Sequence, residues 1–248
     1  MNILELKNVS FSVAEGGSDK EIVRSVDLAI PQNKLIAVTG PNGGGKSTLA
    51  KLIAGIEKPT EGEIYYKGEN ITEKSITDRA RMGIGYAFQR PVKFKGIRVI
   101  DLLRIASGKR ISVAEACEFL SSVGLCARDY IEREVNASLS GGELKRIEIA
   151  TLLARKTELA VFDEPEAGID LWSFNSLISV FGKLREKTDG GSLVIISHQE
   201  RILSIADEII VLKDGAVASH GSREDILPTL IGTQSAVNYC VKIDPQRR

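Results

Sequence analysis

The sequence predicts an α/β protein built on a largely parallel sheet, and three features support this fold class. A glycine-rich stretch, residues 40–48, lies between an apolar run and a helix-like pattern. Three more apolar runs, residues 159–162, 193–196 and 209–212, are continuous rather than alternating, as expected of strands covered on both faces. Helical stretches separate the first two runs and precede the third, which is typical of parallel strands joined by crossover helices.

Composition and charge narrow the class of protein. The chain has 248 residues, 43% of them hydrophobic, so it can bury a sizeable core. Lys+Arg and Asp+Glu both number 33, so we expect no nucleic-acid partner and no membrane insertion. The three cysteines, Cys117, Cys126 and Cys240, form no metal-binding spacing and suit a reducing compartment. With no signal-peptide layout and no long apolar run, the sequence favours a cytoplasmic protein.

The N-terminal part is expected to form an antiparallel β-subdomain beside the parallel sheet. Residues 2–11 and 23–30 alternate in polarity and predict two strands, with a turn at residues 16–19 between them. Residues 63–66 predict another short strand. These strands would pack beside the strand at residues 35–38, which leads into the glycine-rich stretch.

A mostly helical lobe follows, over about residues 91–156. Apolar residues recur there at helical spacing, and Ser112 with Glu115 forms a capping-box pattern before a helix. No linker rich in Pro, Gly or Ser separates this region. We therefore expect one domain, with a core of residues 1–90 and 157–248 and the helical lobe inserted between them.

The stretch from Gly40 to Thr48 fits the phosphate-loop pattern G-x-x-x-x-G-K-[ST]. Its glycines let backbone N–H groups turn toward a phosphate, and the helix start that follows favours negative charge. Lys46 would reach the β- and γ-phosphates, and Ser47 would hold Mg²⁺. The alternative, a glycine-rich turn with an exposed lysine, does not account for the matching strand and helix on either side. The residues predicted to hold a nucleotide here are Gly40, Asn42, Gly43, Gly44, Gly45, Lys46, Ser47 and Thr48.

Polar residues follow the other buried runs, at the strand ends where open parallel sheets bind ligands. Asp163 would hold Mg²⁺, and Glu164 would orient or deprotonate an attacking water. The alternative for both is an acidic helix start before Pro165. His198 alone would more often be structural, but its place after a core strand suggests a γ-phosphate sensor. Gln89 could touch Mg²⁺ or the water and report the nucleotide state to the lobe.

A second candidate phosphate cradle lies at Ser140-Gly141-Gly142-Glu143. It opens the helix-forming run Leu144–Ala154, and Ser140 with Glu143 satisfies the capping-box pattern. This stretch has no lysine or acidic partner of its own, so we infer that it serves a nucleotide held by another copy. The alternative is an ordinary capped helix with glycines at its entrance.

The order of these motifs resembles that of the ABC-type ATPases, over nearly the whole chain. Gly40–Thr48, Gln89, Leu139–Glu143, Leu159–Glu164, Ala167–Asp170 and His198 stand where that family has its Walker A, Q-loop, signature, Walker B, D-loop and H-loop. The resemblance implies an ATPase with ATP and Mg²⁺ as cofactors and a head-to-tail homodimer that encloses two ATP molecules. It also implies that Lys46, Glu164 and His198 are catalytic and that Asp170 contacts nucleotide. The implied Mg²⁺ site is formed by Ser47, Gln89 and Asp163.

Several stretches are similar to SufC, the ATPase of the SUF iron–sulfur cluster assembly system. They are Asp78-Arg79-Ala80, Gly83-Ile84-Gly85, Ala87–Val92, Gly96-Ile97, Arg133–Asn136, Ser140–Arg146 and Glu200–Leu203. This similarity implies a SufB- or SufD-like scaffold protein as partner, bound through the region around Gln89 and the helical lobe. The alternative is the nucleotide-binding subunit of a membrane importer, and a non-hydrolysing regulatory protein is disfavoured because Glu164 and His198 are both present.

Val13 stands where many transporter ATPases have a tyrosine that stacks on adenine, and SufC proteins also tend to lack that aromatic residue. The chain departs from the SufC-like pattern at three other places. Gln199 replaces the tyrosine that usually follows the switch histidine. The segment 165–174 lacks the usual Asp-Ser-Gly-Leu-Asp pattern, and the helical lobe is short. These departures suggest a divergent branch, like the minimal two-component SUF-type systems.

Overall fold

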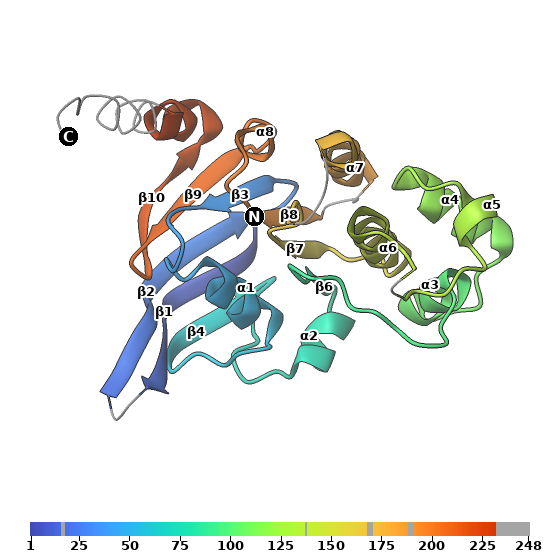
Figure 1. Ribbon diagram of the computed structural model, residues 1–248. Helices are drawn as coiled ribbons and strands as arrows, with labels where there is room; N and C mark the ends of the chain where they lie inside the picture. Colours follow the sequence, from blue (N-terminus) through green and yellow to red (C-terminus); the bar gives the residue numbers. More distant parts are fainter. Residues whose placement is uncertain (16–17, 137, 168–170, 188–190, 232–248) are drawn as a thin grey trace, which may run out of the picture.

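Two β-sheets and a group of helices make up the protein (Figure 1). The computed structural model describes residues 1–15, 18–136, 138–167, 171–187 and 191–231. In this part of the chain, no helix has both the length and the apolar character needed to cross a membrane.

The larger sheet has six strands in the order β10-β9-β3-β8-β7-β6. Five of them run parallel, and β10 pairs antiparallel with β9. The bounds are β3 (Leu35–Thr39), β6 (Ile84–Ala87), β7 (Leu159–Asp163), β8 (Ser192–Ile196), β9 (Glu208–Lys213) and β10 (Ala216–Ser222). The parallel sheet and its three apolar strands are thus confirmed, while β6 was not anticipated.

The smaller sheet is antiparallel, with the order β2-β1-β4-β5. Its strands are β1 (Asn2–Glu15), β2 (Ser18–Pro31), β4 (Glu61–Tyr66) and β5 (Glu69–Asn70). The turn predicted at residues 16–19 is wrong for Ser18 and Asp19, which pair with Glu15 and Ala14 as part of the hairpin. Gly16 and Gly17 lie outside the described residues. The two strands are longer than the alternation indicated because cross-strand pairing continues beyond the apolar residues.

One group of helices, α3–α6, lies on one side of β7, where α6 separates the sheet from α3–α5 (Figure 1). These four are α3 (Val99–Ser107), α4 (Val113–Ser122), α5 (Ala127–Tyr130) and α6 (Gly141–Ala154). The others are α1 (Lys46–Ala54), α2 (Ile76–Arg81), α7 (Leu171–Lys187) and α8 (Glu200–Leu203). The capping box of Ser112 and Glu115 is present at the start of α4 with both of its hydrogen bonds, as predicted.

Two hydrophobic cores cover the two faces of the larger sheet, and the side chains of β3 lie alternately in one core and in the other. Leu35 and Ala37 face the core that contains α6 and the helical lobe. Ile36 and Val38 face the core shared with α1 and the antiparallel sheet. All four side chains are buried, which explains why this strand has a continuous apolar sequence.

A buried arginine joins α1 to α2. Arg79 is fully buried and donates to the carbonyls of Leu52 and Ile53 at the end of α1, at 2.6 and 3.0 Å. It also donates to the carbonyls of Thr72 and Lys74. Burial lowers its pKa to about 10, so the side chain is still charged at neutral pH. Arg79 therefore supplies a donor to the Ile53 carbonyl at the helix end and a second donor to the Leu52 carbonyl, which also accepts from the N–H of Gly55.

We expect Arg79→Met to destabilise the protein by about 3 kcal/mol, because it leaves several buried carbonyls without a donor. Urea unfolding followed by circular dichroism measures this loss. Arg81→Met is the matched control, because Arg81 lies on the same helix with an exposed side chain. Equal stability of the two variants would contradict the role assigned to Arg79.

Candidate functional site

Three strands bring their carboxyl ends to one edge of the larger sheet. β3, β8 and β7 are adjacent and parallel, so the residues that follow them gather in one place. The hydroxyl of Ser47, on the helix after β3, donates to Asp163 Oδ1 at the end of β7, at 2.9 Å. His198, which follows β8, has its Nε2 atom 3.6 Å from Glu164 Oε1.

The loop between β3 and α1 requires glycine because it lies in close contact with the backbone of neighbouring strands. Gly40 has φ +135°, and a Cβ atom there would lie 1.9 Å from the carbonyl oxygen of Leu212. Gly45 has φ +92°, and a Cβ atom would lie 2.7 Å from the carbonyl oxygen of Ile22. Only glycine can hold the loop in this shape with its backbone facing the cavity.

Lys46 is the first residue of α1, directly after this loop, and is only 5% exposed. Its ammonium donates to the carbonyls of Gly40 and Pro41, both at 2.8 Å, so the loop curls around the charge. Burial lowers the pKa of Lys46, while the negative charges of Glu164 and Asp163 act in the opposite direction. The ammonium can thus neutralise an anion held by the loop.

A cavity of about 540 Å³ opens above the loop. Most of the predicted nucleotide-binding residues line it, together with two residues of β2 that were not anticipated. The lining residues are Lys20, Ile22, Asn42, Gly43, Gly44, Gly45, Lys46, Ser47, Thr48, Gln89 and Glu164. The cavity has room for several groups beyond a phosphate, and Ile22 gives part of its wall an apolar surface.

Glu164 has a strained backbone, with φ +44° in a residue that is not glycine. Its N–H donates to the carbonyl of Ile196 on β8, which helps to hold this conformation. Gln89 donates a hydrogen bond from its amide to Glu164 Oε2. The structure thus directs the Glu164 carboxylate toward Gln89 on one side and His198 on the other.

Tyr86 is a site residue that sequence reasoning missed. Its hydroxyl donates to Asp163 Oδ2 at 2.9 Å, so that both oxygens of this carboxylate carry a hydrogen bond. Burial and the neighbouring negative charge of Asp163 raise the pKa of Tyr86, which keeps the hydroxyl protonated. The only signal in the sequence was an aromatic hydroxyl near the end of a strand close to Gln89.

The Ser140–Glu143 stretch forms a capped helix start, as predicted, at the beginning of α6. Ser140 Oγ accepts from the N–H of Glu143, and Glu143 Oε2 accepts from the N–H of Ser140. Tyr130 donates to the other carboxylate oxygen of Glu143. None of the residues Ser140, Gly141, Gly142 and Glu143 lines the cavity above the phosphate loop. Asp170 lies outside the described residues.

The residues at the cavity fit Mg²⁺ and a nucleoside triphosphate. The loop offers glycine backbone, a buried ammonium and the start of α1 to phosphate groups. Ser47 and Asp163 offer a hydroxyl and a carboxylate oxygen within one hydrogen bond of each other, the ligand type that Mg²⁺ prefers.

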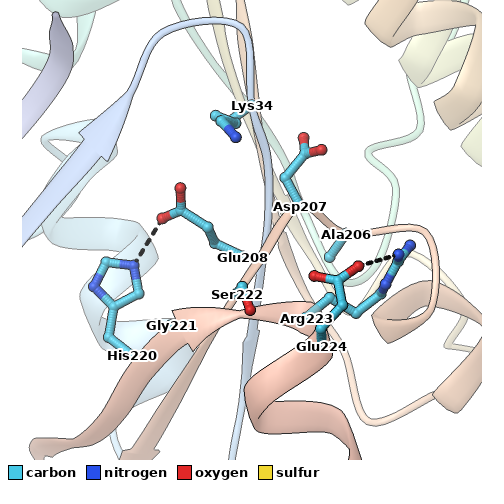
Figure 2. A pocket seen from close by; sticks show the side chains of 9 residues that line it. All are labelled: Lys34, Ala206, Asp207, Glu208, His220, Gly221, Ser222, Arg223 and Glu224. Carbon is cyan, nitrogen blue, oxygen red and sulfur yellow. Dashed lines mark hydrogen bonds and ion pairs between the residues drawn. The ribbon is translucent and has the colours of Figure 1, made fainter.

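A second hollow, of about 460 Å³, lies at the opposite end of the larger sheet, near the amino ends of β3 and β9. Figure 2 shows His220 turned toward Glu208, with 3.0 Å between Nε2 and Oε2, and Arg223 turned toward Glu224. Arg223 and Glu224 form an ion pair within the hollow. None of the residues that line the hollow belongs to the phosphate loop, which lies at the other end of β3.

Comparisons with known proteins agree with this geometry. The family model described as "ABC transporter" matches residues 23–167, which is more than half of the chain. An uncharacterized ABC transporter ATP-binding protein of Methanocaldococcus jannaschii is 39% identical over 234 residues, covering 91% of this chain and 92% of that protein. A probable ATP-dependent transporter, ycf16, of Cyanophora paradoxa is 33% identical over 237 residues, covering 90% and 89%.

Solved structures share the fold. An ATP-binding cassette of an ABC transporter superposes with a TM-score of 0.81 at 26% identity, covering 96% of this chain and 99% of that one. A dimeric cassette in a post-hydrolysis state, bound to ADP and Pi, gives a TM-score of 0.79 at 26% identity, covering 89% and 98%. The predicted ABC ATPase fold is therefore confirmed. The chain belongs to the ABC transporter family, as an ATP-binding cassette that hydrolyses ATP with Mg²⁺ as cofactor.

Proposed function

We propose that two copies of this chain close head to tail over ATP, each completing the other's site. The observation that carries this proposal is the separation of two phosphate-binding elements. Lys46 and the glycine loop line the cavity, whereas the capped helix start at Ser140 lies outside it. Ser140 and Gly141 are exposed at the start of α6, and a helix start is suited to a phosphate brought by a second molecule. The solved cassette with 26% identity is dimeric, which supports the association of two copies.

In this proposal each residue of the site has a defined role, and Gln89 has two. Lys46 would neutralise the γ-phosphate, and Ser47, Asp163 and Gln89 would hold Mg²⁺, which would draw negative charge from the phosphates when bound. Glu164 orients the attacking water and takes its proton, with Gln89 and His198 holding the carboxylate on its two sides. Asp170 is proposed to contact the nucleotide across the dimer.

An apolar groove next to the site is proposed to receive the partner protein. It has a volume of about 900 Å³ and lies between α2, the end of β6 and the helical lobe. Phe88, Val92 and Ile105 line it and are 40%, 47% and 66% exposed. Arg81 and Arg155 lie among the lining residues, so a partner segment with apolar side chains and an acidic end would match it.

We propose a soluble SufB- or SufD-like scaffold as the protein that docks there, so that ATP turnover drives iron–sulfur cluster assembly. The SufC-like stretch Ala87–Val92 supports this partner, because it supplies Phe88 and Val92 to the groove. A second candidate is the membrane subunit of an importer. The names of the curated relatives, which call them transporter ATP-binding proteins, favour that candidate.

Replacing Lys46 with Ala should lower the affinity for ATP by roughly thirtyfold, since a charge-assisted contact worth about 2 kcal/mol is lost. Isothermal titration with Mg·ATP measures the change. Lys51→Ala, on the same helix but away from the cavity lining, is the control and should bind ATP normally. Unchanged binding by the Lys46 variant would rule out the phosphate assignment.

Glu164→Gln keeps the size of the side chain but removes the base, so hydrolysis should fall about 100-fold while ATP still binds. The trapped ATP should hold two chains together, seen as a shift to dimer mass in size-exclusion chromatography with light scattering. Asp214→Asn, in the turn between β9 and β10, is the control. If the Glu164→Gln variant hydrolysed ATP at the wild-type rate, the Glu164 carboxylate would not be the base that activates water.

Ile105→Asp should abolish partner binding, because it places a charge on the apolar groove while leaving the ATP cavity intact. Co-purification from native lysate, with identification by mass spectrometry, measures this loss. Val113→Asp is the matched control, since Val113 is 55% exposed on the same lobe but does not line the groove. A partner recovered only from the membrane fraction would favour the importer.

A further inference from the structure

One buried ion pair on α6 holds both backbone groups of Phe88. The N–H of Phe88 donates to Glu148 Oε1 at 3.1 Å, and its carbonyl accepts from the ammonium of Lys145. Lys145 and Glu148 also pair with each other, with 3.0 Å between Nζ and Oε2. Phe88 directly follows β6, so the end of this strand is tied to the middle of α6.

Stability alone does not explain this ion pair. The Lys145 side chain is 1% exposed and that of Glu148 is 15% exposed. Burial raises the pKa of Glu148, and the charge of Lys145 opposes that shift. Buried ion pairs are costly to desolvate, and apolar residues of similar size often replace them with equal or better stability. What the pair adds is a fixed position for the Phe88 backbone.

The elements joined by the pair both belong to the site. Gln89, the residue after Phe88, donates to the Glu164 carboxylate that would position water. Lys145 lies about one turn beyond the start of α6, where Ser140 and its neighbours form the second phosphate cradle. A shift of α6 would therefore carry Phe88 and Gln89 with it.

We propose that Lys145 and Glu148 are positioning residues for ATP hydrolysis. They clamp the backbone of Phe88, so that the neighbouring Gln89 keeps its hydrogen bond to Glu164. Through the same clamp, Gln89 follows any movement of α6. The ring of Phe88 also lines the apolar groove and lies edge-on to Tyr86, with 4.9 Å between ring centroids. The clamp thus connects the apolar groove, the second cradle at the start of α6 and the carboxylate of Glu164. This inference rests on the roles proposed for Glu164 and for the start of α6, and it is independent of which partner binds.

The double variant Lys145→Met/Glu148→Met tests the clamp in the isolated, full-length chain. We expect kcat to fall at least tenfold, because a shift of about 1 Å in a positioned group is enough for such a loss. The KM for ATP should change less than twofold, since Lys46 and the glycine loop are untouched. Hydrogen–deuterium exchange should rise in the peptide spanning residues 86–90, where the Phe88 N–H loses its acceptor.

The matched control is Lys58→Met/Glu73→Met, which removes an exposed ion pair in the part of the chain near β4 and β5. It should leave kcat and exchange at residues 86–90 unchanged. Wild-type kcat in a folded Lys145→Met/Glu148→Met protein would overturn the proposal. So would an equal rise in KM and fall in kcat, which would indicate general damage to the nucleotide site.

If the double variant does not fold, two single variants test whether the clamp affects turnover. Glu148→Gln keeps an oxygen that accepts from the Phe88 N–H, whereas Glu148→Ala removes it. We expect kcat to fall at least fivefold further in the alanine variant, with KM again unchanged. Equal kcat in the two single variants would overturn the clamp, because the acceptor would then have no effect on turnover.

Discussion

The carboxylate of Asp163 is the point at which the separate parts of the site meet. It is 4% exposed, and each of its oxygens accepts one hydrogen bond, from Ser47 after the glycine loop and from Tyr86 on β6. A buried carboxylate without such donors would be costly. These two bonds therefore tie the start of α1, where Ser47 lies, to the edge strand β6.

In the proposed dimer, one chain supplies most of a catalytic site but not all of it. Lys46 and Glu164 line the cavity, while the start of α6, proposed as the second phosphate cradle, does not line it. Phe88 and its clamp on α6 connect the two regions within the chain. The site is thus divided between two chains in this proposal, and the position of α6 relative to the sheet decides when hydrolysis takes place.

Much of the fold and site could be predicted because the signals are local. A glycine loop after an apolar run, polar residues at strand ends and a capping box each depend on residues close in sequence. Tyr86 was missed because its contact with Asp163 depends on β6 lying beside β7, and strand order is not a local property. The sequence indicates Arg79 only through its place in a SufC-like stretch, since charged residues are rarely fully buried and nothing nearby in the sequence points to its carbonyl partners.

The divided site is tested most directly by mixing two inactive variants. Lys46→Ala disables the glycine loop, and Gly141→Asp places a negative charge at the second cradle. A head-to-tail dimer of the two variants contains one site with both elements intact, so the mixture should regain ATP hydrolysis that neither variant shows alone. A mixture that stays inactive at every ratio, although light scattering shows mixed dimers, would contradict the account.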